Sequence, residues 1–283
     1  MNSDIKYTCA ILVLGNLGEP ATISLSSLEN IDSISVCVLS DDAGRAWIRE
    51  NSTDKIKSKL CFHSTKEIEN IISNLDHDID YVSFGNPRFF KLMILKWLLI
   101  LDSFKMHKNI HSCIYTDLDV YWRKSPREVI GKLFEKEISL LIQDDSTLDG
   151  SRQFYCPGIM IWKNSTESKN IIKEVFEIQK KEIDSGVPFP DDKALNYWIN
   201  QNENRKKIKG LPTDLFIIGH RILWLLIGIR GFSLKKTIAF HGNYSVGIKE
   251  KTKLMEAASL SHLSFKRIYF AVDFILRKYV RFL

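Results

Sequence analysis

Short runs of apolar residues, each followed by small or polar residues, recur along the chain and predict a β-sheet. Residues 8–14 (TCAILVL) and 34–39 (ISVCVL) are apolar on both faces, which is typical of central strands in a parallel sheet. A right-handed crossover through a helix at residues 21–30 would bring the carboxyl ends of these strands to one edge. Further strands are expected at residues 60–63, 111–116, 138–142, 158–162 and 237–240.

Three longer segments have the residue patterns of helices. Residues 89–104 (FFKLMILKWLLILDSF) are apolar almost all round, which predicts a helix that is buried on every side. Residues 167–183 are amphipathic, and residues 191–201 begin with two acidic residues where the positive end of a helix dipole would lie. Strands and helices that alternate in this way predict an α/β fold, with a sheet flanked by helices.

The last part of the chain, residues 251–283, is predicted to be a basic amphipathic helical tail that follows a single domain at residues 1–250. From residue 263 onward, apolar side chains interleave with five basic residues, and Asp273 is the only acidic one. Such a helix can lie in an anionic membrane interface. It can equally dock on the domain with its charges in solvent, and the sequence favours neither arrangement.

The ends of the chain and its cysteines bear on the compartment. Asp4 and a short apolar run do not fit a secretory signal, and no stretch is long and apolar enough to span a bilayer. Five cysteines occur without a CxxC pair, and Cys9, Cys37 and Cys113 fall in strand-like runs. Free buried thiols in a reducing compartment are therefore expected. We predict a cytoplasmic protein, which the tail could hold at a membrane surface.

The charge balance limits the class of partner. A net charge of +6, from 40 basic and 34 acidic residues, suits an anionic ligand or an anionic membrane surface. The basic residues are too few and too dispersed to indicate nucleic acid, and no recognition module is visible. We therefore expect no nucleic-acid partner.

The strongest chemical signal is the segment 114–122, IYTDLDVYW. Asp117 and Asp119 follow a buried strand, and in an extended chain this spacing places both carboxylates on the same side. Two carboxylates so close repel each other unless a cation neutralises them. Oxygen ligands of this kind suit Mn²⁺ or Mg²⁺. The sequence therefore predicts a divalent-metal site, the alternative being two solvated aspartates in a turn.

This Asp-x-Asp element, with apolar residues on both sides and an apolar helix before it, resembles the GT-A glycosyltransferases. The order of motifs over residues 8–250 is most similar to the retaining enzymes of glycosyltransferase family 8 and related nucleotide-diphospho-sugar transferases. The resemblance implies a GT-A fold in which Asp117 and Asp119 bind the cation and Asp117 also approaches the donor ribose.

A later histidine in AFHGNYSVGIK extends the resemblance. His241 stands where the family has its third protein ligand to the metal, at the end of a strand. Gly247 and Lys249 approximate the glycine and the lysine that hold the donor diphosphate, with Lys249 displaced by about one residue. Considered without this context, His241 would be an ordinary core or surface histidine.

Two further segments match the family in part. Gly158 corresponds to a glycine that lines the donor sugar, although Cys156 replaces the family's asparagine beside it. Asp191 matches an acidic residue that orients hydroxyl groups of donor or acceptor. Asp192 replaces a glutamine and would lie near the anomeric carbon, where a carboxylate could act as nucleophile, stabilise positive charge or serve as a general base. The alternative for both aspartates is helix capping.

Three other residues are candidates for donor contacts. The resemblance implies that Lys96, in the apolar helix before the Asp-x-Asp element, touches a donor phosphate; alternatively, it could extend its amine to the helix surface. Asn16 and Asp41 follow the first two strands and match the family only in location, where the nucleobase or ribose would lie.

The resemblance implies transfer of a sugar from a nucleoside diphosphate sugar, expected to be a UDP-sugar, to a hydroxyl group. Retention of anomeric configuration is favoured, and the tail suggests a glycan or lipid-linked acceptor in polysaccharide biosynthesis. Two alternatives stay open. One is a nucleotidyltransferase that uses the same carboxylate–metal site, and the other is a catalytically silent adaptor associated with a membrane.

Overall fold

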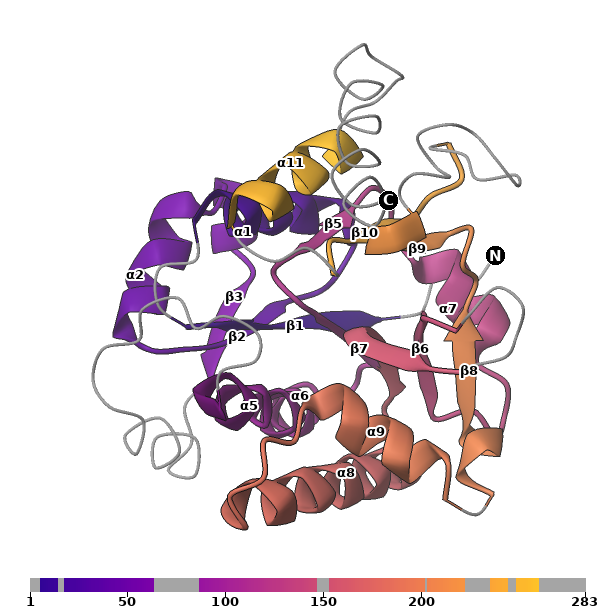
Figure 1. Ribbon diagram of the computed structural model, residues 1–283. Coiled ribbons are helices and arrows are strands. Elements are labelled where there is room, and N and C mark those ends of the chain that lie inside the picture. Colours follow the sequence, from indigo (N-terminus) through magenta and orange to yellow (C-terminus); the bar gives the residue numbers. More distant parts are fainter. Residues whose placement is uncertain are drawn as a thin grey trace, which may run out of the picture.

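A seven-stranded mixed sheet runs through the centre of the molecule (Figure 1). In the computed structural model, residues 6–14, 18–63, 87–146, 153–201, 203–221, 235–243 and 248–259 are described. The strands of the sheet are β1 (Tyr7–Val13), β2 (Val36–Ser40), β3 (Leu60–His63), β4 (Ser112–Thr116), β6 (Leu140–Asp144), β7 (Tyr155–Lys163) and β8 (Ile208–Leu211). Their order is β3-β2-β1-β4-β7-β6-β8. The first four are parallel, and β7 is antiparallel to both of its neighbours.

A second, three-stranded sheet lies against one face of the large one. It contains β5 (Val120–Trp122), β9 (Phe216–Ile218) and β10 (Ala239–His241), with β10 in the middle. β10 pairs antiparallel with β5 and parallel with β9. Because β4 and β5 follow each other in sequence but belong to different sheets, residues 117–119 form the crossing from one sheet to the other.

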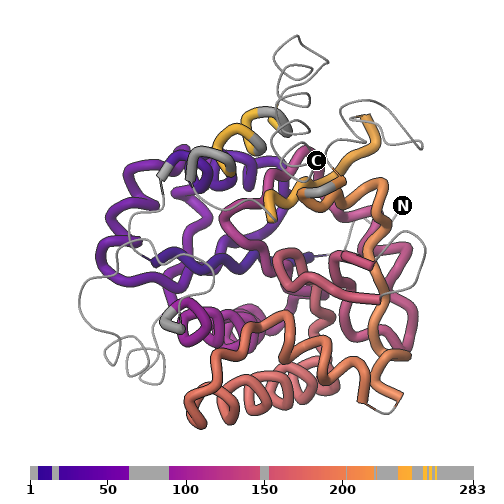
Figure 2. The backbone as a smooth tube through the Cα atoms, viewed as in Figure 1, coloured from indigo at the N-terminus to yellow at the C-terminus, as the bar shows by residue number. Residues whose placement is uncertain are grey.

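Helices complete the two layers around the large sheet (Figure 1). The longer ones are α1 (Gly18–Ser27), α2 (Asp42–Asn51), α5 (Pro87–Met93), α6 (Leu95–Met106), α7 (Arg127–Leu133), α8 (Thr166–Asp184), α9 (Asp191–Ile199) and α11 (Ile248–Ser259). α6, α8 and α9 pack on one face of the sheet, whereas α1, α2, α7 and the small sheet pack on the other. Figure 2 shows α11 beside α1, which joins the late chain to its beginning.

The hydrophobic core is divided between these two faces because side chains alternate along a strand. In β1, Ala10 and Leu12 face the α6 side, while Cys9 and Ile11 face the small sheet. All seven residues of β1 are buried, as its doubly apolar run predicted. The buried helix predicted around residues 89–104 is also found, since most of α6 packs in the core.

Some sequence predictions needed correction. The single helix expected at residues 89–104 is two helices, with a turn at Ile94 where the Trp97 N–H bonds to the carbonyl oxygen three residues earlier. The second strand begins at Val36 rather than at Ile34, whose side chain is about half exposed (49%). Helices α2 and α7 and strands β5, β8 and β9 were not predicted. β5 and β9 have only three residues each, too few for a periodic pattern to show.

The cysteine and membrane predictions can be compared only within the described ranges. All five cysteines are free, and Cys9, Cys37 and Cys113 are buried as expected. None of the helices in these ranges combines the length and the apolar character that a bilayer crossing requires. Residues 251–259 of the predicted tail continue α11 from Ile248. The rest of the predicted tail, residues 260–283, lies outside the described residues.

Candidate active site

Asp117 and Asp119 lie at the crossing between the two sheets, and the backbone on both sides fixes them there. The Asp117 N–H donates to the carbonyl oxygen of Gly158 in β7 at 2.9 Å. The Asp119 carbonyl oxygen accepts from the N–H of Gly242, which follows β10, at 2.7 Å. The first aspartate is therefore tied to the large sheet and the second to the small one.

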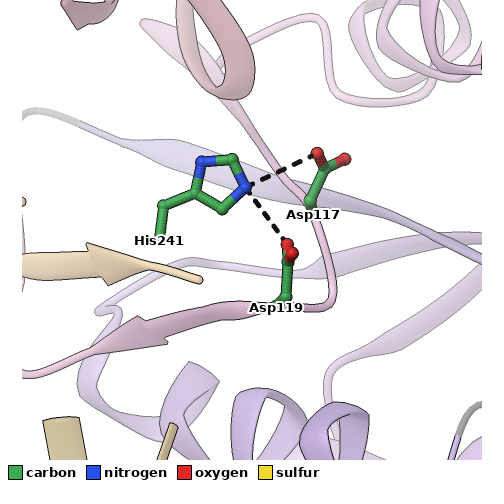
Figure 3. Close-up of side chains that lie close together, drawn as sticks. All are labelled: Asp117, Asp119 and His241. Carbon is green, nitrogen blue, oxygen red and sulfur yellow. Dashed lines mark ion pairs between the residues drawn. The ribbon is translucent and has the colours of Figure 1, made fainter. Parts of the chain in front are cut away.

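His241, the last residue of β10, completes a group of three potential metal ligands (Figure 3). One ligand atom each from Asp117, Asp119 and His241 lies within 4.8 Å of the others. His241 Nε2 is 3.1 Å from Asp119 Oδ1 and 4.0 Å from Asp117 Oδ2. An octahedral cation with bonds of about 2.1 Å would space adjacent ligand atoms by about 3.0 Å and opposite ones by about 4.2 Å. The two separations measured from His241 Nε2 lie close to these values, so the imidazole and either carboxylate could share a small divalent cation such as Mn²⁺ or Mg²⁺.

Electrostatic interactions within this group of residues favour an ionised Asp119 and a protonated His241. Burial alone would raise the pKa of Asp119, but Lys251 and His241 outweigh it and hold that pKa well below its usual range. Burial would lower the pKa of His241, yet Asp119 leads the interactions that raise it well above its ordinary value. Asp119 is thus an anion whose Oδ1 faces His241 and whose Oδ2 faces Lys251. A cation that binds His241 Nε2 would displace the proton that this nitrogen carries in the charged ring.

Gly158 supports the imidazole of His241 directly. A Cβ at this position would lie 2.0 Å from Cε1 of His241 and within 2.7 Å of both ring nitrogens, so the ring rests on the bare backbone of β7. The sequence predicted that Gly158 lines the donor sugar. In the structure the ring of His241 accounts for the glycine.

Substituting Gly158 by alanine is expected to displace the His241 ring and weaken Mn²⁺ binding. We also expect the free energy of unfolding to fall by about 1–3 kcal/mol, the usual cost of overpacking a tight interior. Urea denaturation and a Mn²⁺ titration would measure the two effects. In the His241→Ala background the added methyl has room, so the same substitution should cost less stability there. An equal cost in both backgrounds would rule out the ring as the cause.

Lys96 connects the predicted metal site with the start of α9. Its side chain is 1% exposed, and its ammonium group pairs with Asp191 and lies 3.7 Å from Asp117 Oδ1. The same group lies 4.8 Å from the ring centre of Tyr115. Burial would lower the pKa of Lys96, but the two carboxylates outweigh it and raise the pKa above its ordinary value. Lys96 is therefore a permanent cation held between two acidic residues.

Asp191 and Asp192, the first two residues of α9, differ in their surroundings. Asp191 is buried against Lys96, whereas Asp192 Oδ1 accepts from the Lys193 N–H at 2.7 Å. Burial, followed by the charge of Asp191, raises the pKa of Asp192. The side chain of Asn196 bonds to both the N–H and the carbonyl oxygen of Tyr155 in β7, at 2.9 and 2.7 Å. Asn196 thereby fixes α9 to β7, and Lys96 holds its first residue near Asp117.

Of the other predicted donor contacts, the described structure gives the surroundings of Asp41. Asp41 is the N-cap of α2 and accepts from the Gly44 N–H at 2.7 Å. Asn16 and Gly247 lie outside the described residues. Lys249 lies in α11, but its side chain is not among those described.

Three residues near the predicted ligands were missed by the sequence reasoning. Lys251 Nζ lies 2.7 Å from Asp119 Oδ2, and the Tyr115 hydroxyl donates to Asp117 Oδ1 at 2.9 Å. Gln143 Oε1 lies 2.7 Å from His241 Nδ1. A polar residue at the end of an apolar strand was the signal for Gln143. The lysines at 249, 251 and 253 gave none, because sequence spacing alone does not choose among them.

Comparison with solved structures identifies the fold. A galactosyltransferase, LgtC, in complex with donor and acceptor sugar analogs, matches with a TM-score of 0.55 at 12% identity, over 93% of this chain and 99% of its own. Mouse xyloside xylosyltransferase 1 in its apo form matches with a TM-score of 0.52 at 13% identity, over 86% of this chain and 100% of its own. The glycosyltransferase GlyE from Streptococcus pneumoniae TIGR4 gives 0.55 at 13% identity, over 96% and 64%. These likenesses confirm the predicted GT-A-like α/β fold.

Comparison with sequence families identifies the class of enzyme. No curated protein gives a significant match to the chain. The profile of the nucleotide-diphospho-sugar transferases matches residues 52–255, which is more than half of the chain and includes Asp117, Asp119 and His241. The chain is a glycosyltransferase that belongs to the nucleotide-diphospho-sugar transferase family.

Proposed function

We propose that this protein transfers a sugar from a UDP-sugar to a hydroxyl group of a glycan or lipid-linked acceptor, with Mn²⁺ or Mg²⁺ as cofactor and with retention of anomeric configuration. The observation that carries the proposal is the convergence of Asp117, Asp119 and His241, which each place one potential ligand atom within 4.8 Å of the others. The cation, when bound, would supply positive charge to the diphosphate of the donor.

Lys251 extends this positive region beyond the metal ligands. Its ammonium group lies beside Asp119 and comes from α11, on the small-sheet side of the molecule (Figure 1). A lysine placed next to a metal-bound diphosphate would stabilise the negative charge that develops as the sugar departs. We therefore propose Lys251 for the role that the sequence assigned to Lys249.

The carboxylates of α9 are proposed to act on the sugar. Asp191 Oδ2 is held by Lys96, which orients the carboxylate so that Oδ1 could accept a hydrogen bond from a sugar hydroxyl. Asp192 is not paired with Lys96, and its raised pKa is caused first by burial. We propose that Asp192 lies near the anomeric carbon and stabilises its positive charge. Retention rests on the resemblance of these motifs to retaining enzymes.

Ligand-dependent stability tests this proposal. We expect Mn²⁺ together with UDP to raise the free energy of unfolding by about 2.7 kcal/mol at a hundredfold excess over Kd. GDP, CDP and ADP should give smaller shifts, and EDTA should remove the shift with UDP.

The same experiment separates the alternatives. A shift with nucleoside triphosphates alone would indicate nucleotidyl transfer. If no nucleotide changes the free energy of unfolding of the folded protein, the proposed donor site is wrong. The catalytically silent adaptor would then be the favoured alternative. Once an acceptor is found, NMR of the product's anomeric proton decides between retention and inversion.

A further inference from the structure

Gln143 is a fully buried polar residue in a strand that is otherwise apolar over its first three positions. It lies near the end of β6, and alternation along the strand puts it on the same face as Leu141, toward the small sheet. The pairing of β6 with β7 shifts register directly after Ile142, so that Gln143 pairs with Cys156.

The side chain of Gln143 spans two strands of the small sheet. Its Oε1 lies 2.7 Å from His241 Nδ1 in β10, and its Nε2 donates to the carbonyl oxygen of Ile217 in β9 at 3.4 Å. Because a carbonyl oxygen can only accept, the amide must turn its NH₂ group toward Ile217. The oxygen of Gln143 is then the atom that faces His241, and it too can only accept.

When His241 is neutral, as a metal ligand must be, this arrangement determines which of its nitrogens carries the proton. An acceptor beside Nδ1 requires a hydrogen on Nδ1, so in the neutral ring the lone pair lies on Nε2. Nε2 is the nitrogen that points toward Asp117 and Asp119 (Figure 3). The Cys156 sulfur is also near Nδ1, but at 3.7 Å it is a weaker and more distant partner than Gln143.

We propose that Gln143 is a positioning residue that holds His241 in the Nδ1–H tautomer and orients Nε2 toward the cation. The inference rests on the proposed metal site and adds the residue that prepares its third ligand. A metal-binding histidine is commonly held through its second nitrogen, and loss of such a partner typically weakens metal binding by about 10- to 100-fold.

The test compares Gln143→Leu with Gln143→Glu by titrating each purified protein with Mn²⁺ and following free Mn²⁺ by EPR. Both variants lose the bond to Ile217, but only the glutamate keeps an acceptor for Nδ1. We expect Gln143→Leu to bind Mn²⁺ about 10- to 100-fold more weakly than the wild type. Gln143→Glu should restore the affinity toward the wild-type value.

A control separates this effect from the loss of any buried amide. Gln179 is also fully buried, and its Oε1 accepts from Trp97 Nε1 at 2.7 Å on the other face of the sheet. Gln179→Leu should leave the Mn²⁺ affinity unchanged, and urea denaturation checks that each variant is folded. Equal Mn²⁺ affinity in Gln143→Leu and the wild type would overturn the role of Gln143, as would a Gln143→Glu variant as weak as the leucine. A folded wild type that binds no Mn²⁺ would instead overturn the proposed metal site.

Discussion

Replacing Asp119 by asparagine is expected to lower the rate of sugar transfer by about a thousandfold. Asp119 Oδ1 faces His241 and Oδ2 faces Lys251. The neutral amide of asparagine therefore removes the negative charge that pairs with both residues. It also removes one of the proposed metal ligands. A bound cation contributes several kcal/mol to stabilising the charge of the departing group, and each tenfold in rate corresponds to about 1.4 kcal/mol. UDP release from a panel of UDP-sugars, at saturating Mn²⁺, measures the effect.

The control for this substitution is an aspartate of α8 that lies far from the site. The Asp184 side chain is 60% exposed, and Asp184→Asn should leave both the rate and Mn²⁺ binding unchanged. Asp119→Asn should also bind Mn²⁺ much more weakly than the wild type. If it binds Mn²⁺ normally, Asp119 is not a ligand and the proposed metal site is wrong.

Substituting Lys96 by methionine is expected to reduce the free energy of unfolding by about 3–5 kcal/mol, because it leaves buried carboxylates without their counter-ion. Lys96 is almost fully buried, and Asp191 lies with it in the interior. Methionine keeps the unbranched shape of the side chain, so the loss is mainly one of charge. Urea denaturation at neutral pH measures the change.

Two further variants test whether the lost charge causes the lower stability of Lys96→Met. Lys96→Arg keeps the charge and should retain more stability than the methionine variant. Lys105 is on the same helix with its side chain 75% exposed and lies 3.8 Å from Asp102, so Lys105→Met should cost less than about 1 kcal/mol. If Lys96→Met instead keeps full stability and only raises the donor concentration needed for half-maximal rate, Lys96 contacts the donor as the sequence suggested.

The part of the fold that the sequence predicted is the part with strong local patterns. β1, β3 and β4 follow apolar runs, and the crossing at Asp117 and Asp119 follows β4 directly. The small sheet was not predicted as a sheet, because its three strands are very short and come from distant parts of the chain. Its existence depends on pairing between β5, β9 and β10, which no local window of sequence contains.

The residues of the candidate site also differ in how far the sequence predicts them. Asp117 and Asp119 are predicted from the local pattern of residues 114–122, whereas His241 was predicted only from the order of family motifs. Gln143 and Tyr115 act through contacts that arise when strands pair, so residue type alone did not distinguish them from other strand residues. For Gly158, the family resemblance implied a role in lining the donor sugar, whereas the close approach of the His241 ring depends on how two sheets pack.

The position of His241 on β10 has a consequence for biosynthesis. A ribosome makes Asp117 and Asp119 long before residue 241, so a growing chain displays two carboxylates without the imidazole and without the strand that pairs with β5. Closing so long a loop carries an entropic cost before its contacts form. The nascent protein would therefore complete its proposed cation site only after β10 has been made and has paired with β5. Metal uptake would then mark the moment at which the late part of the chain docks.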